Sequence, residues 1–315
     1  MPTVMRPSGR RGRRGITLLL SVLFAAGSQA GGAPLVEETL QVPVQSTVTA
    51  QRPFRQSISV RIVRVPAAGR RPILVLLHGR DGDARQRARL ALPIYPANAR
   101  YFASRGFVVI VPLRIGYGIS GGPDIEFTGD CADKRYGEGV EPALRETQQV
   151  LAFVRRLPYV DATRGIVVGE SFGGLVAIAA TANPVPGLLG VVNIEGGDGG
   201  DAVQRPDEPC SPDQLRVTLA QYGQTSRLPT LWLYSANDRL WGNRYPREWY
   251  AAFRKAGGAG HVHAVAGRQE QRTLHLQPQR AGVAPGIREL RRVAGAVRPA
   301  RAALTRVSPA SRSAP

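Results

Sequence analysis

The chain has 315 residues, of which 43% are hydrophobic and 21% are charged, so it can bury one large core. This composition excludes a chain that is disordered throughout. The net charge is +19, of which residues 1–30 carry +5 and residues 256–315 carry +8, leaving +6 for the long middle segment. Because the basic residues gather at the two ends, and the last segment has no aromatic residue to stack on a base, we expect no nucleic-acid partner.

Residues 1–30 have the arrangement of a secretory signal peptide. Several arginines precede an apolar run at residues 16–26, and small residues follow it up to Ala30. The run is short for a permanent membrane span, so an uncleaved anchor is the weaker alternative and we expect no stable span after cleavage. Arg13 and Arg14 resemble the start of a twin-arginine signal, but the residues after them do not complete it. We therefore predict an exported protein, periplasmic or secreted, and leave the export route open.

The rest of the chain alternates between apolar strands and helices. Residues 57–65 alternate polar and apolar side chains, as a half-exposed edge strand does. Continuous apolar runs, typical of strands buried on both faces, follow at residues 73–77, 107–111 and 166–168, and further strands are predicted at residues 188–194 and 230–234. Helices are predicted at residues 84–105, 140–157, 175–182, 213–222 and 246–256, and a last strand at residues 261–265. This alternation predicts an α/β fold, a mostly parallel sheet with helices on both faces.

One strand end carries a motif with a chemical meaning. Gly169-Glu170-Ser171-Phe172-Gly173 directly follows the run at residues 166–168 and precedes the helix at residues 175–182. The pattern fits a nucleophile elbow, in which a serine sits on a strained turn from strand to helix. The glycines leave room for that turn. A glycine-rich turn without catalytic meaning is the alternative, and the strand-turn-helix context favours the elbow.

Polar residues also follow three other predicted strands where each one ends. They lie at residues 78–82, 114–122 and 235–238. Ligands of open parallel sheets bind at the carboxyl ends of the strands, so we expect these residues to lie around one site with Ser171.

Together with the elbow, these motifs make the chain similar to the α/β-hydrolase fold, within its dienelactone-hydrolase-like and prolyl-oligopeptidase-like branch. The resemblance covers about residues 57–258 and rests on the His78-Gly79 turn, the loop at residues 114–122, the elbow and Asn237-Asp238. Dienelactone hydrolases carry a cysteine nucleophile and are not exported. This chain has Ser171 behind a signal peptide, so the resemblance implies no lactone specificity.

The chemistry of serine catalysis suggests a role for each of these motifs. A serine hydroxyl is a weak nucleophile until a base removes its proton, and the base needs an acid to fix its tautomer. Asp238 is the candidate acid because it follows Ser171 in the chain order of this fold, and the alternative is a turn aspartate that caps the next helix. The fold implies that the backbone N–H groups of Phe172 and Arg80 form the oxyanion hole. We expect His78 to be a structural member of its turn.

The base is the least determined part of the predicted site. His261 and His263 belong to the predicted last strand, whereas His275 lies beyond it, where the resemblance places the catalytic histidine. The surroundings of His275 do not look like the family's glycine-rich turn, and beyond Lys255 the chain has no lysine, aspartate or aromatic residue. Such a change is typical of a disordered tail or of a coding sequence read out of frame from about residue 260. His275 is the candidate base, with His261 or His263, or no base at all, as alternatives.

These patterns divide the chain into three segments. We predict a signal peptide at residues 1–30, an α/β-hydrolase domain at residues 31–266 and an atypical Arg/Ala-rich tail at residues 267–315. The apolar residues of the tail are mainly Ala and Val, and Pro299 interrupts any helix there. A segment of this kind buries little surface against the entropy lost on ordering it, so we expect it to be poorly ordered or loosely packed, with His275 not held firmly against Asp238.

The chain has two cysteines, Cys131 and Cys210, both in loops of the exported part. An even number of cysteines in an oxidising compartment predicts a disulfide, with two independent thiols as the alternative. Neither cysteine has the spacing of a metal site, and we expect no metal or other cofactor.

The sequence therefore predicts an exported serine hydrolase that cleaves a carboxylic ester or an amide through an acyl-enzyme. The substrate is a small-molecule ester or a peptide, and the sequence carries no signal for an oligomeric state. The alternatives are a hydrolase scaffold that lacks a working histidine, and a peptidase of the prolyl-oligopeptidase type. Five aromatic residues are candidates to line an apolar pocket, although packing against the sheet is the favoured interpretation: Tyr117, Trp241, Tyr245, Trp249 and Tyr250.

Overall fold

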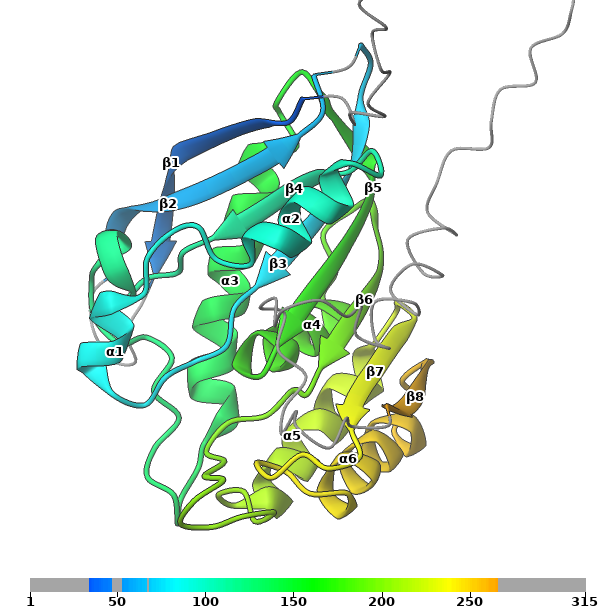
Figure 1. Cartoon of the computed structure of the whole chain (residues 1–315). Coiled ribbons are helices and arrows are strands. Elements are labelled where there is room, and N and C mark those ends of the chain that lie inside the picture. The colour runs from blue at the N-terminus through cyan, green and yellow to red at the C-terminus, as the bar shows by residue number, and fades with distance from the viewer. Residues whose placement is uncertain (1–33, 47–52, 67, 266–315) are drawn as a thin grey trace, which may run out of the picture. The chain divides into compact units, whose positions relative to one another are not determined.

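A single eight-stranded sheet organises the computed structural model, which describes residues 34–46, 53–66 and 68–265 (Figure 1). Its strands, in chain order, are β1 (Val36–Ser46), β2 (Phe54–Arg64), β3 (Arg71–Leu77), β4 (Val108–Pro112), β5 (Val160–Glu170), β6 (Leu188–Ile194), β7 (Thr230–Ser235) and β8 (Gly260–Val265). Their order in the sheet is β1-β2-β4-β3-β5-β6-β7-β8. The pairs β1–β2 and β2–β4 are antiparallel and all other pairs are parallel, which confirms the predicted mostly parallel sheet.

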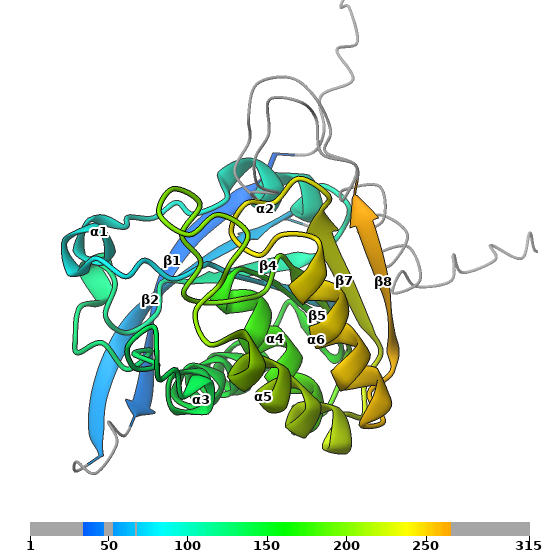
Figure 2. The ribbon, with the colours of Figure 1, turned by 90° about the horizontal axis from the view of Figure 1, so that it is seen from below.

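Helices cover both faces of the sheet, as predicted. They are α1 (Ala84–Arg89), α2 (Pro96–Ala103), the 3-10 turn η1 (Gly118–Ser120), α3 (Tyr136–Val154), α4 (Phe172–Ala182), α5 (Pro212–Thr225) and α6 (Arg244–Lys255). Figure 2 shows α2 on one side of the sheet and α3, α4 and α5 on the other. Successive side chains of β3 point to opposite faces, so Ile73 and Val75 join the core under α3–α6 while Leu74 and Leu76 join the core under α2. The carboxyl ends of β3, β5, β6 and β7 consequently meet at one edge.

The structure corrects the prediction of an edge strand at residues 57–65. β2 lies between β1 and β4, and the edge is β1, which pairs with β2 along its whole length. β1 is hard to recognise because most of its outward-facing residues are polar and Pro43 lies inside it. An edge strand tolerates proline, since the missing N–H can fall on the unpaired side.

The single helix predicted at residues 84–105 is also wrong, because the structure has two helices there. α1 ends at Arg89, and α2 begins at Pro96 after a segment that contains Pro93. A proline disfavours helical backbone in the residue before it, and it has no N–H to continue a helix, whereas the first turn of a helix accepts it. Ile94 and Tyr95 in the connecting segment are buried and pack with the core under α2.

Both terminal segments of the predicted organisation lie outside the described residues. These are the signal peptide at residues 1–30 and the whole tail at residues 267–315, so the expectation of a loosely packed tail stays a prediction. Within the described residues, all eight strands fall inside the predicted hydrolase domain. In that same part of the chain, none of the helices is both long and apolar enough to cross a membrane.

Candidate active site

Ser171 stands on a strained turn between β5 and α4. Its backbone has φ 54° and ψ −123°, a conformation that side chains disfavour and that costs about 1–3 kcal/mol to hold. The side chain is half-buried and does not cap α4. The hydroxyl group is therefore available at the N-terminus of the helix, where the helix dipole favours negative charge.

Two glycines allow the elbow to pack closely against its neighbours. A Cβ atom placed on Gly173 would lie 2.5 Å from the carbonyl oxygen of Leu77, so no other residue fits between α4 and the end of β3. A Cβ atom placed on Gly79 would lie 3.1 Å from Cβ of Ser171 and 3.6 Å from its Oγ. The turn that follows β3 is thus in direct contact with the candidate nucleophile.

His78 in this turn is committed to backbone hydrogen bonds. Its Nε2 lies 3.3 Å from the backbone nitrogen of Arg114, which can only donate, so Nε2 accepts and Nδ1 carries the proton. Nδ1 then donates to the carbonyl oxygen of Gly79, 2.7 Å away. Burial and the charge of Arg114 lower the pKa of His78 well below its ordinary value, so the ring is neutral. With both nitrogens occupied, His78 has the structural role that the sequence predicts and is not a base for Ser171.

Asp238 lies in the turn after β7, at the same edge of the sheet as Ser171. It is buried, and its Oδ1 accepts a hydrogen bond of 2.7 Å from the backbone N–H of Leu240. The next helix, α6, begins at Arg244 with Asn243 as its N-cap. The alternative that Asp238 caps this helix is therefore wrong, and its bond to Leu240 orders the turn itself.

A pocket borders Asp238. It has a volume of about 710 Å³, and its lining combines carboxylates, arginines and small residues from the turns after β6 and β7. The residues are Pro206, Asp207, Glu208, Ala236, Asn237, Asp238, Arg239, Gly242, Asn243, Arg244 and Tyr245.

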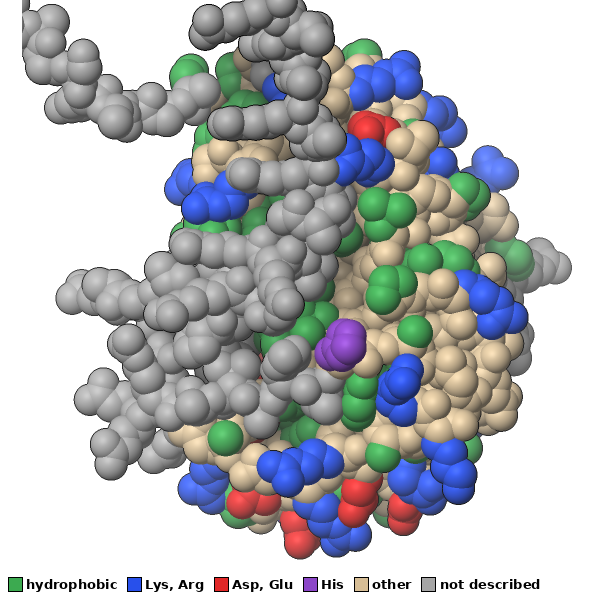
Figure 3. Space-filling view, turned by 90° about the vertical axis from the view of Figure 1, so that its right-hand side faces the viewer, with side chains coloured by type: hydrophobic (Ala, Val, Ile, Leu, Met, Phe, Trp, Pro, Cys, Tyr) green, Lys and Arg blue, Asp and Glu red, His purple; other side chains and the backbone are tan. Residues whose placement is uncertain are grey.

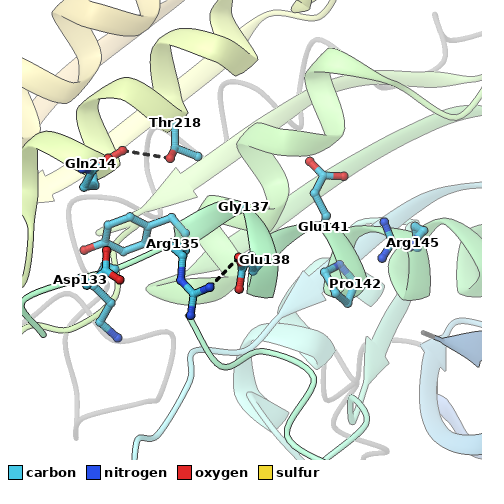
Figure 4. A pocket seen from close by; sticks show the side chains of 11 residues that line it. Asp133, Arg135, Gly137, Glu138, Glu141, Pro142, Arg145, Gln214 and Thr218 are labelled. Atoms are coloured by element: carbon cyan, nitrogen blue, oxygen red, sulfur yellow. Dashed lines mark hydrogen bonds and ion pairs between the residues drawn. The ribbon is translucent and has the colours of Figure 1, made fainter. Parts of the chain in front are cut away.

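A second pocket, of about 600 Å³, lies on the side of α3 and α5 (Figure 4). Its lining includes the ion pair between Arg135 and Glu138, and Gln214 with Thr218 on α5. It contains neither Ser171 nor Asp238, so it is separate from the candidate active site.

Glu195 is a buried carboxylate at this edge that the sequence analysis did not identify. It follows β6 directly, has φ 48°, and its Oε1 accepts a hydrogen bond of 3.0 Å from the backbone N–H of Ser235. Its neighbour Ile194 accepts a hydrogen bond from the N–H of Ser171. The available signal was an acidic residue directly after a buried strand.

The described residues do not supply a histidine base beside Ser171. His261 is exposed on β8. Figure 3 views the molecule from the right-hand side of Figure 1, and Asp and Glu side chains lie among Lys and Arg along its lower rim. His263 is on the same strand with its side chain outside the description, and His275 lies outside the described residues altogether. Assignment of the base therefore stays a prediction.

The structure joins Cys131 and Cys210 in a disulfide, with an S–S distance of 2.02 Å. The bond connects the loop before α3 with the loop before α5, and the hydroxyl of Ser211 donates to the carbonyl oxygen of Cys131 across the same junction. The predicted pairing is confirmed. Within the described residues, no cluster of His, Cys, Asp and Glu side chains has the composition of a metal site.

The aromatic residues near Asp238 mostly pack in the core, as the favoured interpretation had it. Trp241 and Trp249 are fully buried with ring centroids 5.9 Å apart, and the indole N–H of Trp241 donates to the carbonyl oxygen of Glu195. Tyr250 packs against the core, and Tyr117 is buried in the loop after β4. Tyr245 packs against the core and also lines the pocket beside Asp238.

The chain is similar to several solved structures. An acetyl xylan esterase from Paenibacillus sp. R4 is 18% identical, with a TM-score of 0.53 over 84% of this chain and 89% of that chain. A dienelactone hydrolase-like promiscuous phosphotriesterase from metagenomic libraries is 17% identical, with a TM-score of 0.47 over 73% of this chain and 82% of that chain.

A third solved structure, the acylaminoacyl peptidase of Pyrococcus horikoshii, is 11% identical, with a TM-score of 0.48 over 73% of this chain and 37% of that chain. No curated protein sequence matches the chain. Residues 74–310 match the alpha/beta hydrolase family, a span that begins in β3 and includes the elbow, Asp238 and His275. The chain belongs to the alpha/beta hydrolase family.

Proposed function

We propose that this chain is an exported serine hydrolase that cleaves a carboxylic ester through an acyl-enzyme on Ser171. The observation that carries the proposal is the strained backbone of Ser171 at the start of α4, with Gly79 packed against its side chain. Structures retain strain of this kind where function requires it, and an elbow serine is the usual nucleophile of this family. The peptide bond is the alternative substrate.

The reaction follows from the groups at this edge. The Oγ of Ser171 attacks the ester carbonyl carbon while the base takes the hydroxyl proton, which forms a tetrahedral oxyanion. When this intermediate collapses, the bond to the leaving oxygen breaks and the base returns its proton to the departing alcohol. Water then attacks the acyl-enzyme with the same base, releasing the carboxylic acid and the free serine.

Two backbone N–H groups are proposed to bind the oxyanion. That of Phe172 belongs to the first turn of α4, and that of Arg80 follows Gly79, whose Cα faces Ser171. Loss of one such donor typically lowers kcat about 10²- to 10³-fold. The placement of Gly79 beside Ser171 is what favours Arg80 as the second donor.

Asp238 is the proposed acid and His275 the proposed base. Asp238 is buried and ordered by its bond to Leu240, at the same end of the sheet as Ser171. The family match extends to residue 310 and so includes His275. Asp238 would hold the imidazole in the tautomer that accepts the serine proton.

Export rests on the predicted signal peptide at residues 1–30 and on the disulfide. A bond between Cys131 and Cys210 forms and persists in an oxidising compartment such as the bacterial periplasm or the medium. The proposed organisation is the signal peptide, the hydrolase domain at residues 31–266 and the tail at residues 267–315, with no metal or cofactor in the reaction.

A fluorophosphonate probe tests the nucleophile. We expect the full-length protein to be labelled and Ser171→Ala not to be labelled, while Ser104→Ala, which changes an exposed serine on α2's C-cap, is labelled like the wild type. Labelling that persists in Ser171→Ala contradicts the proposal. A folded wild-type protein that is not labelled supports the alternative, a hydrolase scaffold without turnover.

The same material identifies the base and the bond that is cleaved. We expect His275→Ala to lower kcat for p-nitrophenyl acetate at least 10³-fold and His261→Ala and His263→Ala to leave it within threefold of the wild type, because a general base is needed for both steps. If His261→Ala or His263→Ala loses turnover and His275→Ala keeps it, the base is a histidine of β8. Faster turnover of a peptide anilide than of the ester would replace the esterase proposal with the peptidase alternative.

A further inference from the structure

We propose that Arg114 is the positioning residue of the oxyanion hole, because its guanidinium holds the peptide between Gly79 and Arg80 in the orientation that presents the N–H of Arg80 to the substrate. This inference rests on the proposed function. It concerns a residue in the loop after β4 that does not reach the reacting atoms itself.

The contacts of Arg114 converge on the turn after β3. Its NH1 donates to the carbonyl oxygen of His78 at 2.7 Å, and its NH2 donates to the carbonyl oxygen of Gly79 at 3.3 Å. Its backbone N–H donates to Nε2 of His78, whose Nδ1 holds the same Gly79 carbonyl from the other direction. Two consecutive carbonyl groups of the turn are thus fixed by one residue and by the histidine that it orients.

Peptide geometry transmits this restraint to the candidate donor. The carbonyl of Gly79 and the N–H of Arg80 belong to one planar peptide unit and point in opposite directions. Fixing the carbonyl oxygen therefore fixes the direction of the N–H. A Cβ atom placed on Gly79 would lie 3.1 Å from Cβ of Ser171, so this N–H belongs to the residue directly after the one that packs against the nucleophile.

Arg114 also lies beside the other proposed donor. Its guanidinium carbon is 5.9 Å from the ring centroid of Phe172, the residue whose backbone N–H follows Ser171. The Phe172 ring is fully buried, so the guanidinium lies against the first residue of α4 as well as against the turn after β3. One side chain consequently lies near Phe172 and also binds the carbonyl of the peptide unit that contains the N–H of Arg80.

The guanidinium is itself held rigidly. Both oxygens of Glu126 accept from it, through Nε and through NH2, and the hydroxyl of Tyr117 donates to Oε2 of Glu126 at 2.6 Å. The Tyr117 ring stacks edge-on against His78 at 4.5 Å. Arg114, Glu126, Tyr117 and His78 are all at most 2% exposed, so packing as well as hydrogen bonding restrains the group.

Charge supports the same assignment. Burial works against the cation, but Glu126, Tyr117 and Glu146 together outweigh it, and the pKa of Arg114 lies above its ordinary value. A buried ion pair is weak evidence for stability, because well-packed apolar residues often stabilise a core as much. What an apolar pair lacks is a set of fixed donors, and here those donors are directed at the His78 and Gly79 carbonyls.

The experiment compares Arg114→Lys with the wild type on a chromogenic ester. Lysine keeps the charge but cannot bind both Glu126 oxygens and two carbonyls at once, since its donors radiate from one atom. We expect kcat to fall about 30- to 100-fold, with KM within threefold of the wild type, because a misplaced donor acts on the transition state. Arg216→Lys, the same change in an exposed ion pair on α5, should change neither constant.

Binding of a trifluoromethyl ketone separates positioning from a general loss of structure. Its hemiketal adduct with serine places an oxyanion in the hole, so its affinity should fall by the same factor as kcat/KM in Arg114→Lys. Tyr117→Phe, which removes only the bond to Glu126, should show the same pattern with a loss of about 3- to 10-fold. A kcat of Arg114→Lys within threefold of the wild type, or equal losses in kcat and in substrate affinity, overturns the proposal.

Crystal structures keep the two proposals distinguishable. If the wild type neither labels nor turns over, the serine-hydrolase proposal fails, and the orientation of the peptide between Gly79 and Arg80 still decides the role of Arg114. We expect this peptide to be rotated or disordered in Arg114→Lys. An unchanged peptide in a well-folded variant overturns the positioning role.

Discussion

The two sides of Ser171 are built differently. On one side, the turn after β3 is held by a fully buried network of His78, Arg114, Tyr117 and Glu126. On the other side, Asp238 lies in a short turn beside a pocket of about 710 Å³, and its candidate partner His275 comes from a chain segment beyond β8. The first side is complete within residues 78–126, whereas the second depends on a distant part of the chain.

This difference separates two requirements of catalysis. An oxyanion hole must be rigid before the substrate arrives, because its contribution comes from donors that need not reorganise. An acid–base pair must instead bring together side chains from separate loops at the right protonation state. The turn after β3 can therefore be rigid whether or not Asp238 and a histidine form an acid–base pair. The proposed oxyanion hole and the proposed acid–base pair can be tested independently.

The side of Ser171 that contains Asp238, the proposed acid, is tested most strongly by Asp238→Asn. We expect kcat to fall about 10⁴-fold, because the amide leaves the geometry intact but favours the wrong histidine tautomer. Asparagine keeps an oxygen that can accept from Leu240, so the melting temperature should change little. Asp213→Asn, the same change on exposed α5, is the control for ester turnover. A loss smaller than tenfold would move the acid to another carboxylate, of which Glu195 is the first to examine.

On the other side of Ser171, the buried Glu146 should make the free energy of unfolding depend on pH. Burial raises the pKa of Glu146, beneath the loop after β4, to about 8, although the charge of Arg114 opposes the shift. An unfolded glutamate loses its proton near pH 4.5, so between about pH 4.5 and 8 the folded state binds more protons and stability falls as pH rises.

Urea unfolding measures this effect in the wild type and in Glu146→Gln. We expect the wild type to lose about 3–5 kcal/mol of unfolding free energy from this group across that pH range. Glu146→Gln, which keeps an acceptor for the N–H of Ile115, should lack that part of the slope. Parallel pH profiles of the two proteins would show that Glu146 is ionised in the folded protein.

The disulfide connects loops that belong to the two sides, so its removal should loosen both. Cys131 and Cys210 are 79 residues apart, and we expect Cys131→Ala/Cys210→Ala to lose about 2–4 kcal/mol of unfolding free energy. Wild-type protein unfolded in the presence of dithiothreitol should match the variant. Equal stability of the variant and the oxidised wild type would show that the bond does not constrain the chain.

The smallest change in stability is expected between the two sides, at Ser171 itself. Ser171→Gly should abolish ester hydrolysis and raise the unfolding free energy by about 1 kcal/mol, because glycine relieves the strain at φ 54° but loses more entropy on folding. Ser104→Gly, at an ordinary helical backbone angle, should instead destabilise the protein slightly. Chemical denaturation of both variants measures the difference, and a less stable Ser171→Gly would contradict the strain argument.

Local pattern was sufficient for most of the fold and for the elbow. The residues of β6 and the positions of β3, β5 and β7 follow from short, mainly apolar segments, since strands buried on both faces are mostly apolar. The strand, glycines and helix around Ser171 are neighbours in the chain, so the sequence could indicate their geometry. Polar β1 and the proline break between α1 and α2 were missed because each is a weak local signal.

The surroundings of Ser171 required the tertiary structure. Arg114 is separated in the chain from the carbonyls that it restrains, and it meets them only because β4 lies beside β3 in the sheet. The exclusion of a helix-capping role for Asp238 likewise depended on where α6 begins. The sequence determines which residues end each strand, but hydrogen bonds between strand ends depend on the order of the strands, because that order sets which polar groups are buried together.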